Sequence, residues 1–104
     1  MNPTKSVQRQ AAIAFLQAMV ALHKSERQMH KASEAVRYAC SSQDEFERLD
    51  DERDLALIDI NRTLAAFNKS RDNFVAATAH LRYGKSTDEA DLIDQANDII
   101  NATK

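Results

Sequence analysis

Residues 46–81, FERLDDERDLALIDINRTLAAFNKSRDNFVAATAHL, carry the pattern that decides the fold. One set of residues recurs there in steps of three and four, the spacing of a packed helical seam. Its members are Phe46, Leu49, Arg53, Leu57, Ile60, Leu64, Phe67, Arg71, Phe74, Thr78 and Leu81. The pattern predicts one long helix over about residues 43–83, with arginine at two seam positions and threonine at one.

The residues before this stretch repeat the same kind of pattern. At about 100° of rotation per residue, one face of a helix collects Phe15, Met19, Leu22, Met29, Val36 and Cys40. Asn2 followed by Pro3 is typical of a helix start, with a capping side chain before proline at the first helical position. The sequence therefore predicts a first helix over about residues 3–41.

No glycine or proline occurs between Thr4 and Tyr83, so a single continuous helix is the alternative to two. Ser42-Gln43-Asp44-Glu45 favours a break, because it has the form of a capping box and starts an acidic turn. Residues 1–42 hold six Lys/Arg and two Asp/Glu, whereas residues 43–54 hold two and seven. An antiparallel hairpin would lay the acidic segment against the basic residues of the first helix, which are Lys24, Arg27, Lys31 and Arg37.

A short third helix is expected at the C-terminal end. Tyr83-Gly84 is typical of a left-handed helix cap, and Ser86-Thr87-Asp88-Glu89 is a second capping box. One apolar stripe follows, formed by Leu92, Ile93, Ala96, Ile99 and Ile100. A helix of this length must dock to be stable, and a second apolar face of the first helix is available at Ile13, Leu16 and Val20. The predicted fold is all-α: a long antiparallel hairpin (about 3–41 and 43–83) with a third helix (about 87–102) on its open end. We expect one helical-bundle domain over 1–104.

The apolar run Ala11–Leu22, preceded by Lys5 and Arg9, also resembles the start of a signal peptide. Gln17 interrupts it, no small-residue cleavage site follows, and a bilayer-spanning helix needs about 20 residues. We therefore expect a buried helix segment and no membrane partner. Cys40 is the only cysteine, which fits a reducing cytosol and predicts a cytoplasmic protein.

Residues able to carry chemistry are scattered. Glu26, His30 and Glu34 share one helix face, but this spacing is also that of an ordinary surface network, and zinc needs three or four convergent ligands. His23, His80 and Cys40 are not expected to meet, and no glycine-rich turn is present to cradle a phosphate. The sequence predicts no metal, no cofactor and no enzymatic activity.

The remaining signal is for macromolecular partners. Leu55 and Ile58, continued by Ala65, fall opposite the seam and could receive another helix; Ile13, Leu16 and Val20 are the second candidate. We expect a small interaction module of the adaptor, chaperone or inhibitor type that forms a homodimer. The alternative is a nucleic-acid-associated regulator that uses the basic face of the first helix, which comprises Lys24, Arg27, Lys31, Arg37 and Tyr38.

Overall fold

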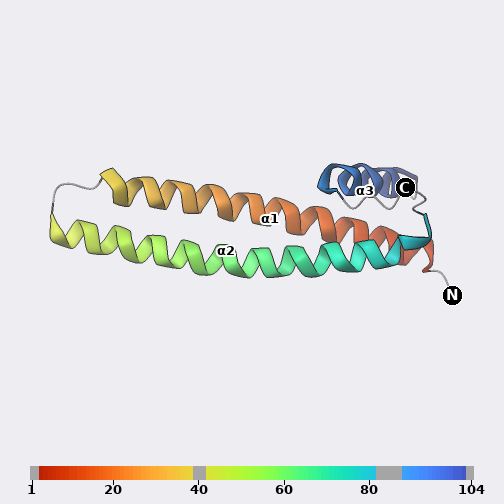
Figure 1. Cartoon of the computed structure of the whole chain (residues 1–104), viewed down its shortest axis with the longest axis horizontal. Coiled ribbons are helices and arrows are strands. Elements are labelled where there is room, and N and C mark those ends of the chain that lie inside the picture. Colours follow the sequence, from red (N-terminus) through yellow and green to blue (C-terminus); the bar gives the residue numbers. More distant parts are fainter. Residues whose placement is uncertain (1–2, 39–41, 82–87, 103–104) are drawn as a thin grey trace. The chain divides into compact units, whose positions relative to one another are not determined.

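The structure, a computed structural model, describes residues 3–38, 42–81 and 88–102, and these ranges contain helices and no strand. In chain order the elements are α1 (Lys5–Tyr38), α2 (Gln43–Ala77), the short 3₁₀ helix η1 (Ala79–Leu81) and α3 (Glu89–Ala102) (Figure 1). The two long helices pack against each other, and α3 contacts α1. The predicted all-α hairpin with a short third helix is confirmed.

The break between the long helices is where the capping box places it. The backbone N–H of Glu45 donates to the Ser42 hydroxyl at 3.1 Å, and the N–H of Phe46 donates to the Ser42 carbonyl, also at 3.1 Å. At the start of α1 the prediction is wrong by two residues: the N–H of Val7 donates to Thr4 Oγ1 at 3.2 Å. Thr4 therefore caps α1 in place of Asn2, which lies outside the described residues. Both caps satisfy N–H groups that have no partner inside the helix.

The helix ends differ more from the sequence prediction. Continuous α-helix was expected to residue 83, but α2 ends at Ala77. Thr78 is fully buried and its hydroxyl donates to the Phe74 carbonyl at 2.7 Å, after which Leu81 bonds back to Thr78 in a 3₁₀ turn. The predicted Tyr83-Gly84 cap lies outside the described residues. Leu92 N–H donates to the Asp88 carbonyl, so Asp88 directly precedes α3. The predicted start at residue 87, and Ser86 of the predicted capping box, lie outside the described residues.

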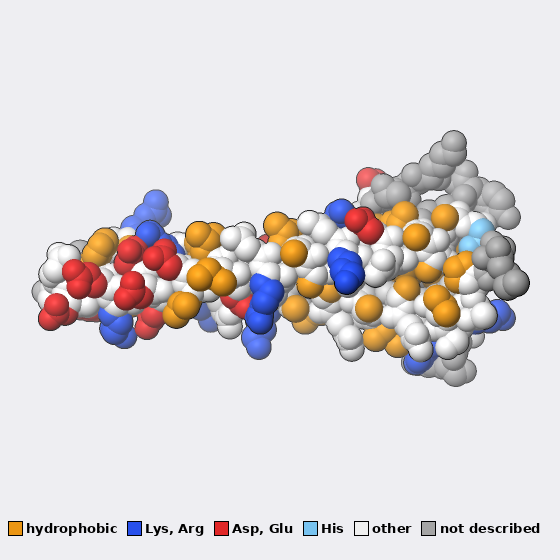
Figure 2. All heavy atoms as spheres, turned by 90° about the horizontal axis from the view of Figure 1, so that it is seen from below, with side chains coloured by type: hydrophobic (Ala, Val, Ile, Leu, Met, Phe, Trp, Pro, Cys, Tyr) orange, Lys and Arg blue, Asp and Glu red, His pale blue; other side chains and the backbone are white. Residues whose placement is uncertain are grey.

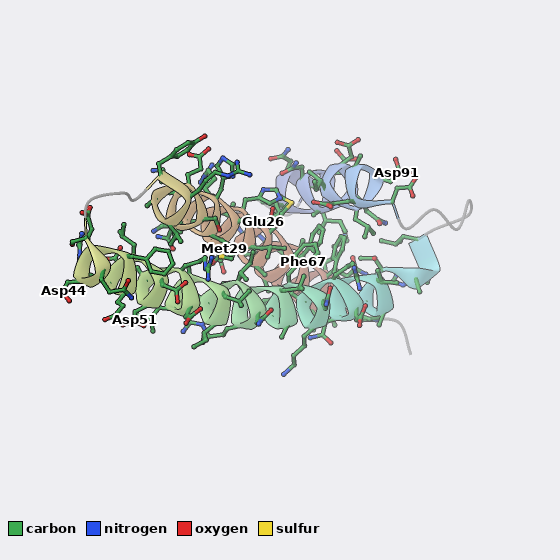
Figure 3. All side chains as sticks on the ribbon, turned by 60° about the vertical axis from the view of Figure 1, so that its left-hand side comes forward. Glu26, Met29, Asp44, Asp51, Phe67 and Asp91 are labelled. Atoms are coloured by element: carbon green, nitrogen blue, oxygen red, sulfur yellow. The ribbon has the colours of Figure 1, made fainter. Side chains whose placement is uncertain are left out.

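The chain divides into two compact units, of which the first comprises residues 1–19 and 66–104. Its core is built around Phe15, whose ring stacks on Phe74 at 5.3 Å between centroids and lies tilted against Phe67 at 5.7 Å. Figure 3 shows Phe67 on the side of α2 that turns toward α1. α3 adds Leu92 and Ala96, which are 1% and 0% exposed. Three helices therefore enclose this core.

The expected docking face for α3 is only partly used. Ile13 and Leu16 are half-buried in the first unit, but Val20 is 61% exposed and belongs to the second unit. The contact between α3 and α1 thus agrees with the prediction, and Val20 is the residue of the predicted face that stays uncovered. Single-domain behaviour, inferred from chain length, stays a prediction.

The second unit, residues 20–65, is the part of the hairpin next to the turn, and it has a thin core. Among its described residues only Leu22, Ser25 and Val36 are buried. The α2 seam was expected to pack along its whole length, yet here Phe46, Leu57 and Leu64 are 42–46% exposed. This expectation is wrong because two helices alone shield one line of side chains, whereas the first unit has a third helix.

In the described part of the chain, no helix is long and apolar enough to cross a membrane.

Candidate protein-interaction surface

The middle of α2 carries apolar side chains on two sides. Leu55 and Ile58 are three residues apart and share one side, whereas Leu57 is turned by about 100° from Ile58, toward the predicted seam. Leu55 is 66% exposed and Ile58 65%, while Leu57 and Leu64 are 46% and 44% exposed. Together with the exposed Ala65 they form a surface that we call the α2 apolar band: Leu55, Leu57, Ile58, Leu64 and Ala65.

Charged residues border this band. On its N-terminal side lie exposed carboxylates, including Asp51 and Asp54, and the exposed Arg62 lies between Ile58 and Leu64. Figure 2 shows this arrangement on the visible face: red side chains gather toward the turn between α1 and α2, and orange and blue side chains follow farther along α2. Asp44 and Asp51 both project from α2 in Figure 3. An apolar centre with a charged border is the usual composition of a protein-interaction surface.

A polar groove runs between α1 and α2 in the second unit. It has a volume of about 310 Å³ and is lined by Ala21, Lys24, Ser25, Gln28, Asp59, Arg62 and Thr63. Ser25 is 3% exposed, and its hydroxyl donates to Asp59 Oδ2 at 2.8 Å. Arg62 Nη2 donates to the other carboxylate oxygen of Asp59. The bond from Ser25 to Asp59 joins α1 to α2 across 34 positions of sequence and helps to fix the register of the two helices.

These bonds set the charge state of Asp59. The hydroxyl of Ser25, and after it the bond from Arg62, lower the pKa of the Asp59 carboxyl; the charges of Arg62 and Lys24 act in the same direction, and desolvation partly opposes them. A lowered pKa means that the contact stabilises the folded chain above the ordinary carboxyl value of about 3.9. This contribution is lost as the pH falls through the lower, folded-state value.

Replacing Ser25 with alanine should therefore raise the pKa of Asp59 toward its ordinary value, since the largest cause of the shift is removed. NMR titration of the Asp59 carboxyl carbon measures the midpoint directly. Thr63→Ala is a matched control, because Thr63 lines the same groove but its hydroxyl bonds to the Ile60 carbonyl. An unchanged midpoint in Ser25→Ala would contradict this assignment.

Acidic residues of α2 were expected to pair with basic residues of α1, but two of them pair with arginines of α2 itself. Asp50 accepts a bond from Arg53 of its own helix, and Glu52 pairs with Arg48 at 3.6 Å. Such pairs between residues three or four apart on one exposed helix stabilise it by a few tenths of a kcal/mol. Lys24 is the residue of the basic set that acts across the hairpin, through its effect on Asp59.

The five residues of the predicted basic face, Lys24, Arg27, Lys31, Arg37 and Tyr38, are all exposed. The helical spacing places Lys24, Arg27 and Lys31 on one side of α1, and Tyr38, 71% exposed, follows Lys31 by two turns. Arg37 is turned about 100° away from Tyr38. Four of the five residues therefore share a face.

Residues considered for metal binding do not converge. His30 Nε2 lies 3.1 Å from Glu34 Oε1, an exposed pair one helical turn apart. A hollow of about 570 Å³ follows this side of α1, lined by His23, Glu26, Arg27, His30 and Lys31. The described residues contain no group of three His, Cys, Asp or Glu side chains that could hold a metal ion. His80 lies in the first unit, within 3.2 Å of Gln8 Nε2, and Cys40 falls outside the described residues.

Fold and surface together define a helical-hairpin protein with a three-helix core in one unit and an uncovered apolar band in the other. Comparison of the chain with protein-family models, with curated proteins and with solved structures gives no match.

Proposed function

We propose that this protein is a non-enzymatic protein–protein interaction module, of the adaptor, chaperone or inhibitor type, that binds its partner through the α2 apolar band. The observation that carries the proposal is the exposure of Leu55 and Ile58, both about two-thirds, on the side of α2 opposite the predicted seam. We further propose that it works in the reducing cytosol, as the single cysteine suggests.

The packing of the two units supports this choice of surface. An apolar side of a helix is normally buried, because an uncovered one leaves hydrocarbon in water. In the first unit a third helix adds Leu92 and Ala96 to the core. In the second unit the described residues of α1 cover only one side of α2. A helix supplied by a partner would complete the second unit in the same way.

Burial of the α2 apolar band would contribute free energy to binding. Full burial of one large aliphatic side chain contributes about 1.5–3 kcal/mol, and Leu55, Leu57, Ile58 and Leu64 each have roughly half of that still to gain. The sum is several kcal/mol, from which the entropic cost of association must be subtracted. Complementary charges at Asp51, Asp54 and Arg62 would add specificity more than affinity.

Site-specific photocrosslinking tests the proposal. A photoreactive amino acid at position 58 should give protein adducts in living cells, because a partner lies against this position. The matched control is the same amino acid at Gln17, which is exposed on α1 in the first unit. Adducts at neither position, or equal adducts at both, would refute the α2 apolar band as the docking surface.

The second candidate function is nucleic-acid association through Lys24, Arg27, Lys31 and Tyr38, favoured by the exposure of an aromatic ring on the same side of α1 as three cations. Phosphate contacts predict binding that weakens steeply as salt rises, whereas an apolar surface does not. Titrating fluorescent RNA and DNA with the protein at 50 and 200 mM salt separates the two functions.

A further inference from the structure

The charges beside the α2 apolar band are arranged symmetrically about Ile58. Asp54 lies four residues before Ile58 and Arg62 four residues after it. At about 100° per residue, each is turned by about 40° from Ile58, in opposite senses, so all three lie on one side of α2. Asp51 and Ala65 lie seven residues to either side and on the same face. Each acidic residue before Ile58 is thus matched by a basic or small residue at the same distance after it.

We propose that the partner of the α2 apolar band is a second copy of this chain, whose α2 lies antiparallel to the first across a two-fold axis at Ile58. The inference rests on the proposed function and names its partner. In an antiparallel pair, a residue n positions before the axis meets the residue n positions after it. Asp54 of each copy therefore meets Arg62 of the other, and Asp51 meets Ala65. The contact is isologous and closes on itself as a dimer.

The state of the two charges supports this pairing. The Arg62 side chain is 79% exposed, and one of its five N–H donors is used by Asp59, so others can bond a second carboxylate. Asp54 is exposed and makes no ion pair with any described residue. Each copy thus offers an acid and a base at equal distances from one aliphatic centre, and a copy related by the two-fold axis satisfies both at once.

The apolar residues fit the same arrangement. Ile58 meets its own counterpart at the axis, and Leu55, three residues before it, reaches the flank next to Asn61 of the other copy. The small Ala65 side chain permits close approach of the two helices at the ends of the contact. A foreign helix could also cover Ile58, but it would have to supply both charges in this order, which the chain itself already does.

Two charge-reversed variants test the inference. Asp54→Arg places two Arg–Arg contacts in its own dimer, and Arg62→Glu places two Asp–Glu contacts in its own dimer. A mixed dimer of the two variants contains only opposite-charge contacts. By light scattering at micromolar concentration, the wild type should have twice the 11.7 kDa chain mass, each variant alone the single mass, and the equimolar mixture the doubled mass again. Each variant's dimer should dissociate at least tenfold more readily than the wild type's.

Two controls distinguish loss of the dimer contact from loss of folding. Circular dichroism of each variant verifies that helicity is retained, and restoration in the mixture excludes misfolding as the cause of dissociation. Arg48→Glu reverses an exposed charge away from the Ile58 face and should leave the dimer intact. Variants that stay dimeric, or a mixture that stays monomeric, would overturn the antiparallel pairing. A monomeric wild type would overturn the second copy as partner, and the proposed function would then survive only through adducts to a different protein at position 58.

Discussion

Replacement of Phe15 with alanine is expected to lower the free energy of unfolding by about 3–5 kcal/mol, a large fraction of the stability of a small protein. Phe15 is fully buried and contacts both Phe74 and Phe67, so the substitution removes two aromatic contacts and leaves a cavity between α1 and α2. The first unit has no other large side chain of α1 buried to this degree. The loss should therefore not be recovered by local rearrangement.

Urea unfolding followed by circular dichroism measures this effect as a change in midpoint at constant slope. The matched control is Phe46→Ala, which removes the same side chain from a position that is 42% exposed in the second unit. It should cost about 1 kcal/mol or less, because less surface returns to water. Equal losses for the two variants would contradict the division into a thick and a thin core.

The second large effect is expected at Leu92, the most buried large residue of α3. Leu92→Ala should cost about 2–5 kcal/mol, or the whole docking energy of α3 if that is smaller. A helix of 14 residues is marginal in water without tertiary contacts, so α3 should lose helicity once it no longer docks. The far-UV circular dichroism of the variant should therefore weaken at temperatures below the main unfolding transition, because α3 unfolds first.

Thermal unfolding and amide hydrogen exchange measure this change. For a chain of this size, 1 kcal/mol corresponds to a shift in Tm of roughly 4–8 °C. Exchange should accelerate selectively in residues 89–102. Asn97→Ala in the same helix is the control, since Asn97 is exposed and its removal should change neither property appreciably. An unaltered Tm and unaltered exchange in Leu92→Ala would show that α3 does not depend on its buried face.

Signals that act within one turn of helix predicted the fold well. Ser42 and Glu45 are three residues apart, and the bond between them forms as soon as the helix does, so the break was readable from the sequence. The end of α2 was not, because it depends on burial of Thr78 in the core of the first unit. The hydroxyl of Thr78 bonds to the Phe74 carbonyl in the last turn of α2, but nothing local requires α2 to stop before Thr78.

The periodic seam predicted which residues share a face of α2 and not how much of that face is covered. Phe67 and Phe74 are buried in a unit that has three helices, whereas Leu57 and Leu64, which belong to the same seam, are almost half exposed. The exposure of Leu55 and Ile58 agrees with the face assigned to them. The bond from Ser25 to Asp59 had no signal in the sequence, since it depends on the register of two helices rather than on spacing within one.

Solvent accessibility of position 58 in the cell tests the central claim, that another protein covers the α2 apolar band. In a Cys40→Ser background, Ile58→Cys and Gln17→Cys can be labelled with a membrane-permeable maleimide, both in cells and in purified protein diluted to nanomolar concentration. Position 58 should react at least tenfold more slowly in cells than in the diluted protein, while position 17 reacts at similar rates in both. Equal rates at position 58 in cells and after dilution would contradict the account.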